Sequence, residues 1–200
     1  MSTPIGVFEW RFERILLRAF ALLLGVLPVN NSAALDQKTG PRIYLANPLG
    51  FSEAGRNFIR DAIIPELGKH GQVVNPFDLV DPARIKAIEA MPAGAERVKA
   101  WQALNVEIGK LNQDHIDSSD IVFAVLDGVD VDSGTASEIG YAYARNKRIV
   151  GYRGDFRLSA DNEGGVVNLQ VEHFIRASGG TIIRELSGLD RAFSSLTPRR

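Results

Sequence analysis

Short apolar runs alternate with longer amphipathic stretches from about residue 42 to the end of the chain. Runs that stop at polar, glycine or proline residues are typical of strands, which we expect at residues 43–46, 73–74, 121–126, 148–152 and 181–183. Apolar residues at helical spacing predict helices over residues 51–69, 93–118, 135–146, 166–178 and 187–196. This alternation predicts an α/β fold, a doubly wound flavodoxin- or Rossmann-like sheet of five parallel strands with helices on both faces.

The longest predicted helix, residues 93–118, carries one continuous apolar stripe. Its members are Val98, Trp101, Leu104, Ile108, Leu111 and Ile116. We expect Trp101, which lies on this stripe, to be a core residue. The strand at 121–126 is apolar at every position, which favours a central place in the sheet with both faces covered.

The first 40 residues differ in character and are interpreted as an N-terminal extension to a domain at residues 41–200. Three arginines precede an uncharged run at residues 19–29, and a polar linker follows. This pattern fits either a signal-like segment or an extra helix that packs on the domain or on a partner subunit. Eleven residues are too few for a spanning helix, which needs roughly 20 apolar residues. We therefore expect a cytoplasmic protein, with export or membrane attachment as the alternative.

Composition narrows the function classes. With 45% apolar and 24% charged residues, the chain is an ordinary globular sequence rather than a disordered or multi-span membrane protein. The net charge of −1 lacks the basic excess of general nucleic-acid binders. The chain has no cysteine, and its three histidines lack metal-ligand spacing. We expect no metal, no cofactor and no nucleic acid partner.

The candidate chemistry lies in the loop and helix that follow the most apolar strand. In open α/β sheets ligands bind beyond the carboxyl ends of the strands, and no phosphate-binding glycine motif or nucleophile elbow is found there. Asp132 and Glu138 can both point into this crevice, as paired carboxylates do in glycosyl transfer. Gly134 allows either close approach of a ligand or a positive-φ turn. Thr135 and Glu138 also have the form of a capping box, which is the structural alternative. The helix N-terminus is expected to keep Glu138 ionised.

A set of motifs in this order is more specific. The segments are Ile43-Tyr44-Leu45-Ala46-x-Pro48, Asn112-x-x-x-Ile116-x-x-x-Asp120, Asp132-Ser133-Gly134-Thr135-x-x-Glu138-Ile139-Gly140-Tyr141-Ala142, Asn146-Lys147 and Val167-Asn168-Leu169. With these segments, the stretch from Ile43 to about Leu189 resembles the nucleoside 2-deoxyribosyltransferase family. The segment 132–142 is the most specific of them. Residues 1–36 lie outside the resemblance.

The resemblance implies an activity and a role for each matching residue. Glu138 would attack C1′ of a 2′-deoxynucleoside, the base would leave, and a free nucleobase would capture the glycosyl-enzyme. Tyr44 would orient this glutamate, and Asp132 would hold the 5′-hydroxyl side of the sugar. Asn168 would be donated by a neighbouring subunit, which implies a homo-oligomer.

Three further residues are expected near the base. Asn112 stands where many family members carry an aspartate; it cannot act as a general acid, although its amide can donate to and accept from a purine edge. We therefore expect a preference for purines. Phe51 would stack on the base or else only staple the following helix. Asp78 would meet a base edge or else be a solvated turn residue.

Two alternative functions remain open at this point. One is hydrolysis on the same scaffold, with water as the acceptor. The loop at residues 47–52 has no arginine, which favours a free nucleoside over a nucleoside monophosphate as substrate. The other alternative is a non-catalytic nucleoside-binding module, which the presence of both Glu138 and Asp132 disfavours.

Overall fold

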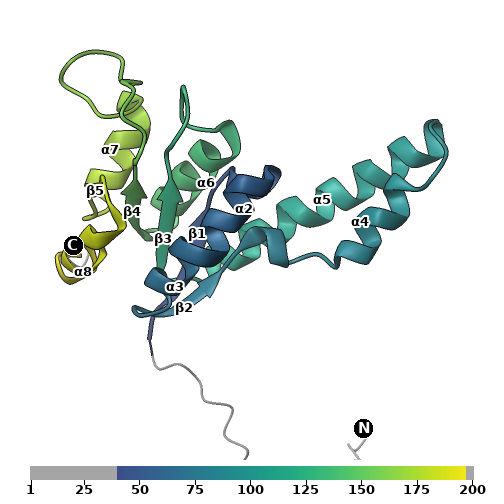
Figure 1. Cartoon of the computed structure of the whole chain (residues 1–200), viewed down its shortest axis with the longest axis horizontal. Coiled ribbons are helices and arrows are strands. Elements are labelled where there is room, and N and C mark those ends of the chain that lie inside the picture. The colour runs from purple at the N-terminus through teal and green to yellow at the C-terminus, as the bar shows by residue number, and fades with distance from the viewer. Residues whose placement is uncertain (1–39, 197–200) are drawn as a thin grey trace, which may run out of the picture. The chain divides into compact units, whose positions relative to one another are not determined.

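Five parallel strands form the centre of the computed structural model, which describes residues 40–196 (Figure 1). The strands are β1 (Arg42–Ala46), β2 (Gln72–Val74), β3 (Ile121–Val125), β4 (Arg148–Tyr152) and β5 (Ile182–Ile183). Their order in the sheet is β2-β1-β3-β4-β5, so β1 and β3 lie side by side where the strand order reverses. This is the flavodoxin-like doubly wound arrangement, and the predicted fold class is confirmed. The predicted N-terminal extension lies outside the described residues, except for Gly40.

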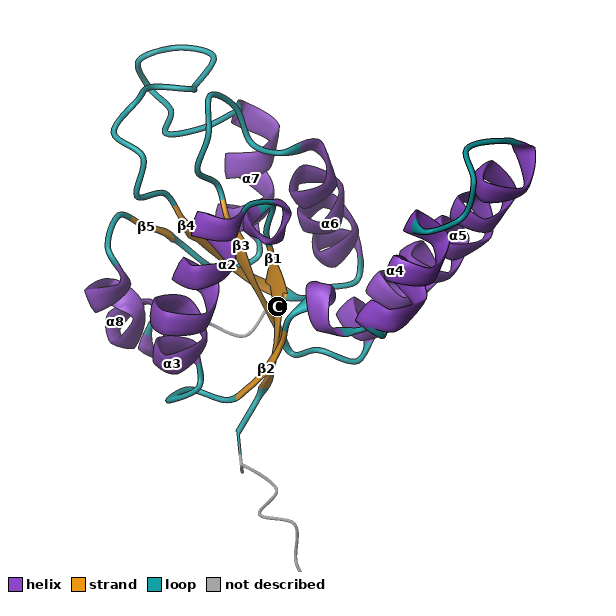
Figure 2. Ribbon diagram, turned by 45° about the vertical axis from the view of Figure 1, so that its right-hand side comes forward, coloured by secondary structure: helices purple, strands orange, loops and turns teal. Residues whose placement is uncertain are grey.

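Helices cover both faces of this sheet (Figure 2). They are α2 (Glu53–Phe58), α3 (Ile64–Leu67), α4 (Pro82–Glu89), α5 (Ala95–Asp117), α6 (Ser133–Ala144), α7 (Leu169–Ala177) and α8 (Leu189–Ser194). Alternate residues of each strand point to opposite faces. Tyr44 and Ala46 of β1 therefore pack with α6 and α7, whereas Ile43 and Leu45 pack with α3 and α8.

The helix predicted over residues 51–69 is broken into unlike pieces. A 3-10 turn at Leu49–Phe51 comes first, and the side chain of Ser52 then caps α2 by accepting a hydrogen bond from the Gly55 amide at 3.0 Å. A π-helical turn at Ile59–Ile63 joins α2 to α3. Pro65 lies two residues beyond the end of this turn, and its missing N–H removes one regular helical hydrogen bond. The widened turn thus lies next to a proline that cannot donate to the regular helical ladder.

Helix α4 was not predicted. It begins with Asp81, which accepts a hydrogen bond from the Ala83 amide at 2.8 Å, and with Pro82 in the first turn. None of its residues is fully buried. Because a helix without a buried face has a weak apolar pattern, the periodicity that identifies the other helices is missing here.

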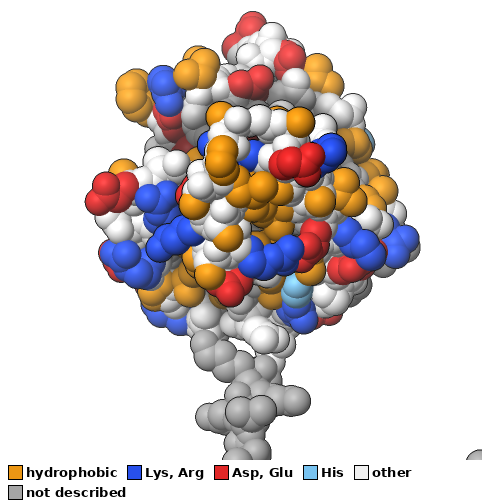
Figure 3. Space-filling model, turned by 90° about the vertical axis from the view of Figure 1, so that its right-hand side faces the viewer, with side chains coloured by type: hydrophobic (Ala, Val, Ile, Leu, Met, Phe, Trp, Pro, Cys, Tyr) orange, Lys and Arg blue, Asp and Glu red, His pale blue; other side chains and the backbone are white. Residues whose placement is uncertain are grey.

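The prediction that Trp101 of α5 is a core residue is wrong. Only Leu104 and Ile116 of this helix are buried; Trp101 is half-buried, and Val98 is 54% exposed. The reason is that α4 and α5 extend away from the sheet as a hairpin (Figures 1 and 2). Seen from that side, hydrophobic side chains gather near the centre of the surface, flanked by charged ones (Figure 3). None of the helices between residues 40 and 196 has the length and apolar character that crossing a membrane requires.

The start of α6 also differs from the prediction. The helix begins at Ser133, and its cap is Asp132, whose carboxylate accepts hydrogen bonds from the Thr135 amide at 2.9 Å and the Thr135 hydroxyl at 3.3 Å. The proposed capping box of Thr135 and Glu138 is therefore wrong. Asp132, three residues before Thr135, already accepts the hydrogen bond from the free amide of the first helical turn. The side chain of Glu138 is therefore available for other contacts.

Candidate active site

The side chain of Glu138 on α6 meets a side chain of β1. The Tyr44 hydroxyl donates a hydrogen bond to Glu138 Oε1 at 2.6 Å. Tyr44 is completely buried in the core between the sheet and α6. Two residues that lie 94 positions apart are thus joined on the face of the sheet that α6 covers, and α6 begins after the loop at the carboxyl end of β3, where a ligand site is expected in this fold.

Burial sets the charge state of this pair. Loss of solvent raises the pKa of Glu138 to about 7, the hydrogen bond from Tyr44 opposes that rise, and the charge of Asp132 adds to it. Burial and the nearby Glu138 carboxylate raise the pKa of Tyr44, so its hydroxyl keeps its proton and donates. The helix N-terminus was expected to keep Glu138 ionised; with a pKa of about 7 the carboxyl group is partly ionised at neutral pH, because the loss of solvent opposes ionisation. Glu138 is poised to titrate near neutral pH.

Asn112 reaches the same carboxylate from α5. Its amide nitrogen donates to Glu138 Oε1 at 3.4 Å, while its Oδ1 is buried and has no hydrogen-bond partner among residues 40–196. A buried acceptor without a partner is uncommon and costs free energy unless a ligand satisfies it. Donors from two elements, β1 and α5, therefore converge on one oxygen of Glu138, which α6 carries, and Glu138 Oε2 receives neither bond.

Asp132 and Gly134 lie one to two turns before Glu138. The carboxylate of Asp132 caps α6, as described above, and its charge acts on Glu138. Gly134 is part of the helix, so the alternative of a positive-φ turn at Gly134 is wrong; in this loop Gly128 has the positive φ, at 135°. Gly134 is exposed, and a Cβ there would meet only Asp132 Oδ2, at 3.1 Å.

Phe51 and Asp78 follow β1 and β2, at the same edge of the sheet. Phe51 is 80% exposed and packs edge-on against Phe77, with ring centroids 5.1 Å apart. A Cβ at Gly50 would overlap the ring of Phe77, so the glycine makes this contact possible. Asp78 is exposed and accepts a hydrogen bond from the Asn75 side chain at 3.0 Å. Sequence reasoning missed Phe77, because a single aromatic residue in a turn carries no periodic signal.

Asn168 is the cap of α7. Its Oδ1 accepts hydrogen bonds from the amides of Gln170 at 3.0 Å and Val171 at 3.4 Å. The helix therefore begins at Leu169 rather than at the predicted residue 166. Within the chain the structure does not bring Asn168 into the hydrogen-bonded group around Glu138.

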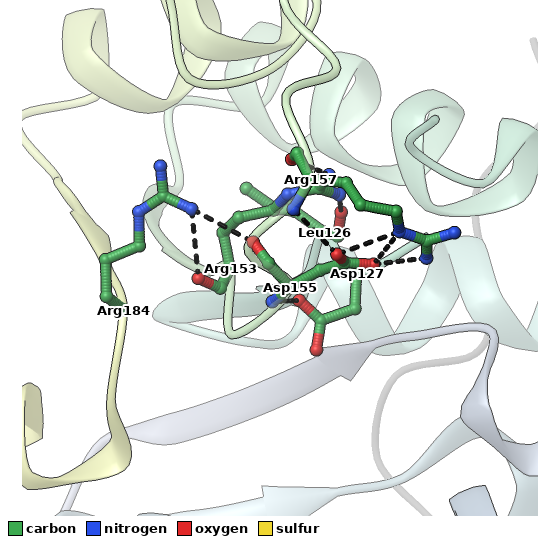
Figure 4. A network of polar contacts seen from close by, with 6 residues as sticks. All are labelled: Leu126, Asp127, Arg153, Asp155, Arg157 and Arg184. Carbon is green, nitrogen blue, oxygen red and sulfur yellow. Dashed lines mark hydrogen bonds and ion pairs between the residues drawn. The ribbon is translucent and has the colours of Figure 1, made fainter. Parts of the chain in front are cut away.

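A polar network joins the loop that follows β3 to the loop that follows β4 (Figure 4). The buried guanidinium of Arg153 donates to the carbonyl oxygens of Leu126 and Arg157, and the Asp155 amide donates to Asp127 Oδ1 at 2.8 Å. Arg184 beside β5 donates to the Asp155 carbonyl at 3.2 Å. No local sequence pattern indicates this network, which fixes the two loops that lead to Asp132 and Asn168.

Comparison with known proteins identifies the family. The sequence model of the family named nucleoside 2-deoxyribosyltransferase matches residues 43–170, more than half of the chain. The chain belongs to this family. The matched segment of this nucleoside 2-deoxyribosyltransferase family member includes Tyr44, Asn112, Asp132, Glu138 and Asn168. The family acts on nucleosides and nucleobases. None of the curated proteins matches the chain.

Solved structures share the fold of this family member at low sequence identity. A conserved protein from Enterococcus faecalis is 21% identical, with a TM-score of 0.56 over 78% of this chain and 98% of that chain. A 2-deoxyribosyltransferase from Leishmania mexicana is 24% identical, with a TM-score of 0.50 over 77% and 95% of the two chains. A 2-deoxyribosyltransferase from Bacillus psychrosaccharolyticus is 22% identical, with a TM-score of 0.50 over 79% and 97%. These likenesses show the doubly wound α/β fold.

Proposed function

We propose that this protein transfers 2-deoxyribose between nucleobases through a covalent glycosyl-enzyme on Glu138. The observation that carries the proposal is the 2.6 Å hydrogen bond from the buried Tyr44 hydroxyl to Glu138 Oε1. A carboxyl group with a pKa of about 7, held in place by a buried donor, is partly ionised at neutral pH, and its ionised form is a nucleophile. Membership of the family supplies the substrate class.

The reaction takes two displacements at C1′. In the first, Glu138 Oε2 attacks C1′, and the electron pair of the C1′–N bond leaves with the base, which takes up a proton. In the second, a ring nitrogen of another base attacks C1′, its proton is lost, and the carboxylate of Glu138 is released. Because Tyr44 and Asn112 both donate to Oε1, we assign the attack to Oε2.

The remaining site residues are proposed as substrate contacts. Asp132 and Gly134, at the start of α6, would face the sugar, and Asp132 would accept from the 5′-hydroxyl. Phe51 would stack on the base from the end of β1, and Asp78 would meet its outer edge.

We also propose that purine 2′-deoxynucleosides are the preferred donors. Asn112 cannot protonate the leaving base, and a purine offers N3 and N7 as sites that solvent or another residue can protonate. Asn112→Asp would supply a general acid at this position, and general acid help is typically worth roughly 10²–10⁴-fold. The ratio of thymidine to deoxyadenosine turnover should therefore rise by about 10²-fold in this variant. Wild-type protein that uses both donors at equal rates would contradict the assignment.

We propose further that the active form is a homo-oligomer in which Asn168 contacts the site of a neighbouring subunit. The residue lies at the start of α7 beside Leu169, which is exposed, and the preceding loop exposes Phe156 and Leu158. Exposed apolar side chains around one loop are a common feature of subunit interfaces. Activity that persists unchanged in a proven monomer would contradict this contact.

One incubation tests the central proposal. The full chain is mixed with deoxyadenosine, with and without a second purine base, and the products are separated. Transfer predicts a new deoxynucleoside that depends on the second base. Release of adenine at the same rate without that base would instead show a hydrolase. Absence of any product would indicate a non-catalytic nucleoside-binding module. Adenosine serves as the matched substrate control, and we expect it to be a poor donor.

A further inference from the structure

Asp117, at the C-terminal end of α5, is the meeting point of three residues from α6 and the turn after it. Its Oδ2 accepts from the Tyr141 hydroxyl at 2.9 Å, and its Oδ1 accepts from Arg145 Nε at 2.7 Å. Its backbone carbonyl accepts from Lys147 Nζ at 2.6 Å. Gln113, one turn earlier on α5, donates to the same Tyr141 hydroxyl at 3.1 Å. This polar cluster joins two helices that are far apart in sequence.

The cluster lies next to the contact between Asn112 and Glu138. Tyr141 follows Glu138 by three residues on α6, so the two side chains occupy neighbouring positions on one side of the helix. On α5, Gln113 directly follows Asn112, and Asp117 lies one turn beyond them. The two helices are therefore linked by two successive contacts, one at the nucleophile and one at Asp117.

The other contacts that hold α5 on the sheet lie near its C-terminal end, where Ile116 is buried and the side chain of His115 bonds to Arg42 of β1. Apart from Leu104 and Ile116 the residues of α5 are not fully buried, and its N-terminal part projects with α4 away from the sheet (Figure 2). The amide nitrogen of Asn112 lies 3.4 Å from Glu138 Oε1, at the long end of hydrogen-bond distances. A small rotation or sliding of α5 would therefore break this contact.

We propose that Asp117 is a positioning residue: by binding Tyr141, Arg145 and Lys147 it holds Asn112 against the carboxylate of Glu138. The proposal rests on the proposed role of Glu138 as the nucleophile. Asp117 does not touch the reacting atoms in this scheme and acts only through the placement of α5. The hydrogen bond from Arg145 holds the pKa of Asp117 below its usual range, so the cluster keeps its charge while Glu138 titrates.

The direction in which the pKa of Glu138 changes separates two possible effects of Asp117: positioning of Asn112, and the direct effect of its negative charge. The carboxylate is faced by Tyr44 from β1, by Asn112 from α5 and by the charge of Asp132 at the start of α6. Losing the Asn112 donor disfavours the charged form, which raises the pKa of Glu138. Removing the negative charge of Asp117 would by itself lower that pKa.

The experiment is a titration of the Glu138 carboxyl by carbon-13 NMR on the full chain with labelled glutamate. We expect Asp117→Ala to raise the midpoint by about half to one pH unit, because a hydrogen bond to the charged form is lost. Tyr141→Phe keeps the ring and all charges, and should raise the midpoint in the same direction. Asp114→Ala is the matched control: it removes a carboxylate from the same helix, but one that pairs with Lys110 on the exposed side.

The same measurement in an Asn112→Ala variant tests whether Asp117 acts on Glu138 through Asn112. Asn112→Ala alone should raise the midpoint, and adding Asp117→Ala to it should raise it no further, because the contact is already gone. Midpoints unchanged or lowered in both Asp117→Ala and Tyr141→Phe, or an upward shift that adds fully in the double variant, would overturn the positioning role.

Kinetics on the same proteins keep the two proposals distinguishable. In active protein the acid limb of the kcat/KM profile should move with the NMR midpoint, while Asp114→Ala keeps the wild-type profile. Upward midpoint shifts in protein that neither transfers nor hydrolyses any deoxynucleoside would support the positioning role and overturn the proposed function.

Discussion

The two ends of α5 lie in different surroundings. Its C-terminal end rests on the sheet through the buried Ile116 and presents Asn112 to Glu138. Its N-terminal end pairs with α4 in a hairpin that projects from the sheet, and Val98 there is 54% exposed. Both ends carry apolar residues at helical spacing, but Ile116 belongs to a core cluster of the sheet, whereas Leu104 is buried outside both core clusters. The difference teaches that α5 joins the core of the sheet only at the end that holds Asn112 against the candidate nucleophile.

The largest difference between the site end and the hairpin end of α5 is expected when one carboxylate near each end is replaced. Glu138→Gln removes the nucleophile and should lower deoxyribosyl transfer by roughly 10⁴-fold or more. Glu107→Gln is the matched change in the hairpin, where Glu107 pairs with Arg84 on the surface at 2.6 Å, and it should leave transfer near the wild-type rate. Both variants are assayed with deoxyadenosine and a second purine base after circular dichroism has established that they fold. Near-normal turnover by folded Glu138→Gln protein would refute the mechanism.

Truncation of apolar side chains sharpens the contrast in stability. Ile116→Ala opens a cavity between α5 and the sheet and should lower the free energy of unfolding by about 2–5 kcal/mol. Val106→Ala in the exposed hairpin should change it by less than about 0.5 kcal/mol. Urea denaturation of the two variants beside the wild type measures both values. Equal losses would mean that the hairpin is covered in solution as well as the sheet end.

Tyr44→Phe tests the strongest contact of the site. It removes the donor to Glu138 Oε1 without changing the ring, and hydrogen bonds to charged groups are worth about 1.5–3 kcal/mol. We expect kcat/KM to fall by about 10- to 100-fold and the pKa of Glu138 to rise, because that hydrogen bond opposes the effect of burial. A pH profile of kcat/KM gives both quantities. An acid limb that stays in place would show that Tyr44 does not act on the carboxylate.

The smallest expected effect is the change with pH. As the pH rises through about 7, activity should increase and the stability contributed by Glu138 should decrease. Attack requires ionised Glu138, so kcat/KM should rise as the pH passes upward through about 7. The pKa of this carboxyl is 4.5 in its ordinary state and higher in the folded protein, so the native state binds the proton more tightly. This contribution to stability is complete below about pH 4.5 and is lost as the pH rises through about 7.

The same linkage gives a stability measurement. Glu138→Gln cannot ionise, so it avoids the loss of stability that the wild type undergoes at higher pH. We expect the difference in melting temperature between variant and wild type to move in favour of the variant from pH 5 to pH 8. A difference that is constant over this range would contradict the raised pKa of Glu138.

The apolar runs were enough to predict the five strands and the doubly wound fold, because a buried parallel strand leaves a strong local signal. Local patterns failed to predict features that depend on contacts between residues far apart in the sequence. Trp101 of α5 looked like a core residue, but the helix leaves the sheet before that residue is fully covered. Helix α4 has no buried face and left no pattern at all.

The candidate site divides in the same way. Motifs placed Glu138, Tyr44 and Asn112 as candidates, and the structure brings these three together. The raised pKa of Glu138 was not predicted, because burial is a property of the folded chain and not of the helix start alone. Tyr141 and Asp117 were also missed as partners, since a contact over 24 positions has no local sequence signature.

The buried guanidinium of Arg153 has a consequence for loop exchange between relatives. Its hydrogen bonds to the Leu126 and Arg157 carbonyls, together with the bond between Asp127 and the Asp155 amide, make the loops after β3 and β4 one structural unit. A loop grafted alone from another family member would leave a buried charge facing carbonyls that have moved. Designs that aim to change substrate range should therefore transplant both loops together, with the arginine that joins them.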